Sequence, residues 1–213
     1  GILTPDMFIN ICEEHGYISK IDFCVLEQMC AYIKKRIDQN LRILPVAINQ
    51  SQKTIHEEGY IERLISTVEK YSVPPRYIEL EVTESAYVNK LDETIAILTQ
   101  LREYGFRISM DDFGTGYSSL NFLKDIPVDA LKIDRAFLSA GLVEKKPAEI
   151  IKSITNMAHN INIKVVCEGV EYPQQISFLE KIGCELVQGY LFGKPMPYDE
   201  VADFIESADN IRY

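Results

Sequence analysis

The sequence lacks tryptophan and has few residues of the kinds that build transition-metal or disulfide sites. Its three histidines, His15, His56 and His159, are far apart in the chain, and none forms an H-E-x-x-H pattern, which argues against a histidine-based metal site. The five cysteines are odd in number and show no C-x-x-C spacing, so neither a disulfide framework nor a thiolate zinc site is indicated. We therefore expect a reducing, cytoplasmic location, and oxygen ligands for any metal.

Basic residues are in the minority. The chain of 213 residues has 22 Lys and Arg against 32 Asp and Glu, which gives a net charge of −10. The field of such a surface repels polyanions, so general DNA or RNA binding is not expected. An anionic substrate would need a local source of positive charge, and a divalent cation held by carboxylates is the best candidate.

Long apolar runs are missing as well. No run approaches the roughly 18 to 20 residues that cross a bilayer, and the opening GILTPDMFINICEEHG has neither the basic nor the apolar region of a signal peptide. We therefore expect no direct membrane contact from this segment. With 11 glycines, 9 prolines and 46% hydrophobic residues, the composition predicts one folded domain over residues 1–213.

Short apolar runs alternate with segments of helical period, a pattern typical of parallel strands joined by crossover helices. The predicted strands are Ile43–Asn49, Tyr77–Val82, Phe106–Asp111, Ala130–Ile133, Ile163–Cys167 and Glu185–Gln188. The predicted helices are Ile61–Tyr71, Leu91–Tyr104, Ala148–Asn160 and Pro173–Ile182, after one that starts at Thr4 and Pro5 and another over about Ile21–Ile37. The class is α/β. A closed (β/α)8 barrel needs eight strands, so six strands fit either an open sheet or a barrel without its first two strands.

Polar side chains stand at the ends of these strands, where apolar residues would otherwise be expected. They are Asn49, Glu81, Asp111, Asp112, Lys132, Glu168 and Gln188. The carboxyl ends of parallel barrel strands open onto one face, so these groups should converge. Several buried carboxylates without counter-charge cost several kcal/mol each. Carboxylate and amide oxygens select hard ions, so the pattern predicts a site for Mg²⁺ or Mn²⁺.

Each of these residues also has a simpler explanation when taken alone. Glu81 and the nearby Glu84 can cap the following helix, and Asn49 can be a hydrogen-bonded core residue, as can Gln188. Asp111 and Asp112 are adjacent and point opposite ways in an extended chain, unless the backbone bends where the strand ends. Lys132 should face the interior, where a lysine is rare without a partner. The coincidence of all of them at one end of the strands favours a common site.

A glycine-containing segment, DDFGTGYSSL, follows the third strand. Gly114, Thr115 and Gly116 allow a flexible loop that approaches a ligand closely. A dinucleotide fingerprint fits poorly, because Ser119 stands in place of the third glycine and two aspartates lie where a pyrophosphate would bind.

Taken together, the segments PVAINQS, ELEVTES, SMDDFGTGYSSLNFLKDIPVDALKID, VVCEGVE and QGYLFGKPMP make the chain resemble the EAL family of cyclic di-GMP phosphodiesterase domains over almost its whole length. The resemblance implies a TIM-like barrel that hydrolyses cyclic di-GMP to linear pGpG with two Mg²⁺ or Mn²⁺ ions. It implies that Asn49, Glu81 and Asp111 hold one ion, and that Asp111, Asp112 and Glu168 hold the second. Lys132 would position the attacking water, Gln188 would support the site, and Glu84 would anchor the glycine loop.

The chain departs from the family at its start, where the namesake E-A-L segment is absent. The resemblance therefore implies an N-terminally truncated domain, without the first two strands of the family barrel and without a metal-binding glutamate, whose activity is impaired. The alternative is a non-catalytic cyclic di-GMP receptor or a dimerising signalling scaffold. A homodimer and further domains of a longer signalling protein are the other partners that we expect.

Overall fold

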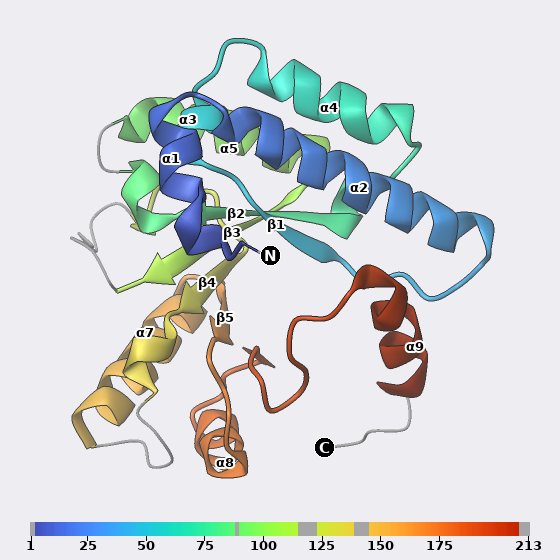
Figure 1. The fold of residues 1–213 in the computed structure, drawn as a ribbon. Coiled ribbons are helices and arrows are strands. Elements are labelled where there is room, and N and C mark those ends of the chain that lie inside the picture. The colour runs from blue at the N-terminus through green and yellow to red at the C-terminus, as the bar shows by residue number, and fades with distance from the viewer. Residues whose placement is uncertain (1–2, 88–89, 115–122, 139–144, 209–213) are drawn as a thin grey trace. The chain divides into compact units, whose positions relative to one another are not determined.

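A computed structural model of the chain describes residues 3–87, 90–114, 123–138 and 145–208 (Figure 1). Its strands form one sheet in the order β1-β2-β3-β4-β5-β6. The pairs β1–β2, β2–β3 and β5–β6 are parallel. Strand bounds are β1 Val46–Asn49, β2 Ile78–Thr83, β3 Arg107–Phe113, β4 Ala130–Ile133, β5 Lys164–Cys167 and β6 Leu186–Val187. The predicted α/β class is confirmed, and each predicted strand overlaps an observed one.

The chain consists of two compact units, each described here by itself. The first comprises residues 1–132 and 161–163, and the second comprises residues 133–160 and 164–213. The helices of the first unit are η1 Pro5–Met7, α1 Ile9–Glu14, α2 Ile18–Asp38, α3 Gln52–Ile55, α4 Tyr60–Lys70, η2 Pro75–Tyr77, η3 Glu84–Tyr87 and α5 Leu91–Tyr104. Those of the second are η4 Arg135–Phe137, α7 Lys145–Asn160, α8 Pro173–Lys181 and α9 Tyr198–Ala208. The single domain over residues 1–213 stays a prediction.

The core of the first unit lies between its strands and its helices. Helices α2, α4 and α5 lie over one side of strands β1–β3 (Figure 1). Ile48, Leu80 and Ile108 are register partners on the three strands, and all are buried. Leu64 of α4 and Leu98 of α5 are completely buried as well. Apolar residues at helical spacing therefore cover the sheet, which fixes the positions of the strand ends.

The N-terminal helices differ in detail from the sequence prediction. Thr4 and Pro5 do start a helical segment, but it is a 3-10 turn, and the Thr4 side chain makes no capping hydrogen bond. The first α-helix begins only at Ile9. Gly105 is the left-handed cap at the end of α5, because it has φ +114° and its N–H bonds to the last turn of the helix.

In the second unit, backbone segments approach closely beside the ends of β5 and β6. Gly169 has φ +71°, and a Cβ atom there would lie 2.2 Å from the Cβ of Arg135. A Cβ on Gly189 would lie 2.1 Å from the carbonyl oxygen of Val170. Only glycine fits at these two positions. Over the residues that the structure describes, no helix combines the length and apolarity needed to span a membrane.

Candidate functional site

Three of the predicted ligands lie at the carboxyl ends of adjacent strands. Asn49 at the end of β1 is the register partner of Glu81 in β2. Asp111 in β3 is the partner of Thr83, two residues beyond Glu81. The Glu81 residue is only 7% exposed, whereas Asn49 is exposed. The parallel register therefore brings these residues to the same edge of the sheet, as the sequence predicts.

Lys132 of β4 ties two of these carboxylates together. Its Nζ lies 2.6 Å from Oε1 of Glu81 and 3.2 Å from Oδ1 of Asp111. The lysine is 4% exposed, so its charge is removed from water and stabilised by these two carboxylates. The sequence predicts a buried, paired lysine, and the structure identifies Glu81 and Asp111 as partners. The cluster of Glu81, Asp111 and Lys132 is the centre of the candidate site.

The backbone bends sharply just after Asp111. Asp112 has φ +56°, a left-handed conformation uncommon for a residue with a side chain. Its N–H donates to Oδ1 of Asp111, at 3.0 Å. The bend is the exception that the sequence analysis allowed for two adjacent aspartates, because it ends the strict alternation of side chains. The role of Asp112 as a metal ligand stays a prediction.

Glu84 connects the next helical turn to the segment after β3. This residue of η3 is 3% exposed, and its Oε2 accepts a hydrogen bond from the Gly114 N–H, at 3.1 Å. Its Oε1 is buried and has no hydrogen-bond partner among the residues that the structure describes. The contact with Gly114 supports the anchoring role that the resemblance implies. Thr115, Gly116 and Ser119 of the predicted loop lie outside the described residues.

Two predicted site residues, Glu168 and Gln188, belong to the second unit. Glu168 directly follows β5, and its N–H donates to the carbonyl oxygen of Ile133, at 3.0 Å. The N–H of Gln188 donates to the carbonyl oxygen of Cys167, at 2.9 Å. Both residues stand at strand ends, as predicted. Their participation in one site with Glu81 and Asp111 stays a prediction.

The sequence analysis missed a buried polar pair that supports Asn49. The hydroxyl of Tyr60 donates to Oε1 of Gln50, at 2.9 Å, and Nε2 of Gln50 donates to the carbonyl oxygen of Asn49, at 2.9 Å. The Gln50 N–H continues the ladder to the carbonyl oxygen of Glu81. Burial raises the pKa of Tyr60, so its hydroxyl remains a donor. In the sequence, Gln50 could have indicated this pair, because it is a polar residue directly after the candidate ligand Asn49.

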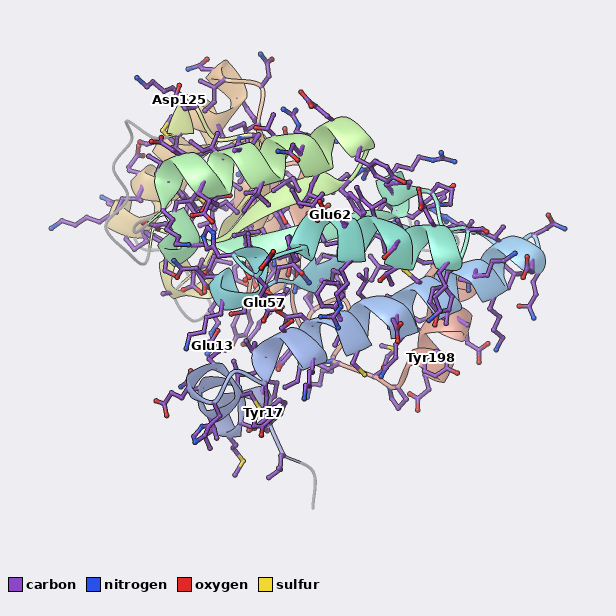
Figure 2. All side chains as sticks on the ribbon, turned by 90° about the horizontal axis from the view of Figure 1, so that it is seen from above. Glu13, Tyr17, Glu57, Glu62, Asp125 and Tyr198 are labelled. Atoms are coloured by element: carbon purple, nitrogen blue, oxygen red, sulfur yellow. The ribbon has the colours of Figure 1, made fainter. Side chains whose placement is uncertain are left out.

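A pocket of about 360 Å³ borders Asn49. Polar groups line it, among them Ser51 and the carboxylates of Asp22 and of Glu13, which extends from α1 (Figure 2). Oδ2 of Asp22 accepts hydrogen bonds from the Ser51 N–H and from Oγ1 of Thr54, and burial raises the pKa of Asp22 above its usual 3.8. The pocket offers a candidate ligand space beside the strand ends.

The oxygen donors fit a hard divalent cation in chemical type. Among the described residues, however, no group of three His, Cys, Asp or Glu side chains is arranged to hold a metal ion. In the cluster, the ammonium of Lys132 contacts Oε1 of Glu81 and Oδ1 of Asp111, one oxygen of each carboxylate.

The EAL domain model matches residues 1–195, and the chain therefore belongs to the EAL domain family. It is 40% identical over 207 residues to the cyclic di-GMP phosphodiesterase NbdA of Pseudomonas aeruginosa, covering 97% of this chain and 26% of NbdA. It is similar to the solved structure of the PaMucR phosphodiesterase in complex with c-di-GMP, with a TM-score of 0.89 and 36% identity over 94% of this chain and 81% of that one.

A third likeness is to the Klebsiella pneumoniae BlrP1 calcium/cy-diGMP complex, with a TM-score of 0.74, 26% identity, and coverage of 84% of this chain and 45% of that one. These likenesses confirm the predicted fold, that of the TIM-like EAL barrels. The chain spans about a quarter of the length of the curated relatives it matches first.

Proposed function

We propose that this chain is the phosphodiesterase domain of a longer bacterial signalling protein that acts in the cytoplasm, and that it hydrolyses cyclic di-GMP to linear pGpG. The observation that carries the proposal is the buried cluster of Glu81, Asp111 and Lys132 at the strand ends of an EAL family member. The names of NbdA and of the PaMucR complex support the substrate. A homodimer is part of the proposal.

Asn49, Glu81 and Asp111 would hold one Mg²⁺ or Mn²⁺ ion, and Asp111, Asp112 and Glu168 would hold the second. When bound, such ions lower the pKa of a coordinated water and neutralise charge on the phosphate. The oxygen-only donor set and the calcium named with the BlrP1 complex support a divalent cation. Bound cations would also solve the electrostatic problem of an acidic protein that binds a dianion.

The role that we propose for Lys132 follows from how it is held. Its stem is buried and two carboxylates fix its ammonium, so its N–H groups point in defined directions at the strand ends. From there it would donate a hydrogen bond to the attacking water and orient that water for in-line displacement at phosphorus. Glu84 would hold the segment after β3 in place through the Gly114 N–H, and Gln188 would support the site.

The test is hydrolysis of cyclic di-GMP in the presence of Mn²⁺, with pGpG quantified by chromatography, for this chain and for the full-length protein. We expect pGpG formation that falls by at least about a hundredfold in Asp111→Asn, since its carboxylate would contact both ions. Asp38→Asn is the control, because Asp38 pairs with Lys34 on an exposed surface. Binding of cyclic di-GMP by the full-length protein without any pGpG would contradict the proposal and favour a receptor.

A further inference from the structure

His56 directly follows α3, and its side chain contacts the start of α5. Its side chain is 9% exposed, and both ring nitrogens face polar atoms of α5. Nδ1 lies 3.2 Å from Oε1 of Glu93, and Nε2 lies 3.2 Å from Oγ1 of Thr94. Thr94 is completely buried. No part of the proposed mechanism uses these three residues.

The hydrogens available in this network determine whether Nε2 of His56 carries a hydrogen. Oγ1 of Thr94 carries one hydrogen, which it donates to the carbonyl oxygen of Ala86, at 3.2 Å. Nε2 of His56 must therefore carry the hydrogen of its own contact with Thr94. His56 is thus the donor that leaves the Thr94 hydroxyl hydrogen available for Ala86.

Glu93 is itself held in its charged form. Hydrogen bonds from Lys90 and from His56 hold the pKa of Glu93 below its usual 4.5. Lys90 Nζ lies 3.0 Å from Oε2 of Glu93. The His56 ring thus lies beside a carboxylate that is ionised at neutral pH, with its Nδ1 3.2 Å from Oε1 of Glu93.

The network ends at the candidate site. Ala86 belongs to η3, the four-residue turn that also carries Glu84. Glu84 in turn holds the N–H of Gly114, three residues after Asp111. The Thr94–Ala86 hydrogen bond therefore fixes the turn on which the Glu84 carboxylate depends for its position.

We propose that His56, Glu93 and Thr94 form a positioning network for the proposed reaction: His56, which lies beside Glu93, donates from Nε2 to the Thr94 hydroxyl, holds this hydroxyl against Ala86 and so keeps Glu84 in contact with Gly114. This inference rests on the proposed function for its catalytic consequence only. The structural part, the coupling of Thr94 to Gly114, can be measured without any turnover.

The test compares Thr94→Val with Thr155→Val. Both threonines are completely buried, and both donate to a backbone carbonyl, but Thr155 lies in α7 and bonds Ile151 within its own helix. In ¹H–¹⁵N spectra of the protein we expect the Gly114 amide to shift upfield in Thr94→Val and to stay in place in Thr155→Val. Thr94→Ser, which keeps the hydroxyl, should restore the Gly114 signal. An unmoved Gly114 signal in folded Thr94→Val would overturn the network.

Two further measurements separate this inference from the proposed function. Imidazole ¹⁵N shifts of His56 in the unaltered protein, which need no folded variant, should show a hydrogen on Nε2, the nitrogen that contacts Thr94. An Nε2 without a hydrogen would overturn the inference. In the hydrolysis assay we expect Thr94→Val to lower kcat about tenfold with little change in KM, as for a group that acts on the transition state. If neither the unaltered protein nor any variant hydrolyses cyclic di-GMP, this result contradicts the proposed function and leaves the network inference intact.

Discussion

Replacing Lys132 with methionine removes a cation that contacts both Glu81 and Asp111 while it keeps most of the buried volume. The side chains of Glu81 and Asp111 are only 9% and 14% exposed. Without Lys132, their two negative charges would lie close together where water solvates them poorly. Removal of one partner of a buried ion pair costs about 3–5 kcal/mol. We expect a loss of this size in the free energy of unfolding at pH 7, measured by urea denaturation with circular dichroism.

The matched control is Lys34→Met. Lys34 also forms a short ion pair, 2.5 Å from Asp38, but the two side chains are 40% and 56% exposed. Such surface pairs contribute about 1 kcal/mol or less. If both variants lost the same small amount of stability, the buried electrostatic coupling at the strand ends would be refuted.

The same variant tests whether the carboxylates accept a divalent ion. In Lys132→Met, a bound Mn²⁺ would replace the lost positive charge beside Glu81 and Asp111, so we expect it to restore part of the lost stability. Binding at 100 times the dissociation constant stabilises a folded state by about 2.7 kcal/mol. No stabilisation of Lys132→Met by Mn²⁺ would contradict a cation site at these residues.

Two predictions concern the second unit. In the second unit, Gly169→Ala should lower the melting temperature of the protein by more than Gly16→Ala does in the first. Both glycines have positive φ, but only at Gly169 would the new Cβ meet the side chain of Arg135. Equal melting temperatures would show that the close approach is relieved at no cost. Partial burial raises the pKa of Glu185, but hydrogen bonds from His159 and from backbone amides outweigh it and bring the pKa below the usual 4.5. The advantage of the unaltered protein over Glu185→Gln in unfolding free energy should therefore be present above pH 4.5 and disappear as the pH falls further; a difference independent of pH would refute this assignment.

Much of the architecture could be predicted because parallel strands buried on both faces are apolar and are separated by helices of regular period. The same reasoning placed Asn49, Glu81 and Asp111 at strand ends, and the observed register brings them to one edge of the sheet. It also predicted that Lys132 would be buried and paired. Chain order and hydrophobic period contain this information directly.

Other features depend on contacts that no local pattern encodes. The left-handed backbone of Asp112, inside β3, accompanies the hydrogen bond of its N–H to the Asp111 side chain. His56 and Thr94 are 38 residues apart, and neither stands at a strand end, so nothing in their sequence context links them. The 3-10 turn at Pro5 in place of a longer helix likewise reflects the tertiary setting of the N-terminal segment.

The central claim, that strand-end oxygens bind divalent ions, is tested most directly by titrating the protein with Mn²⁺ and following the free ion by electron paramagnetic resonance. We predict saturable binding that is lost in Asp111→Asn and preserved in Asp38→Asn. Binding that survives in Asp111→Asn, or no binding by the unaltered protein, would contradict the account.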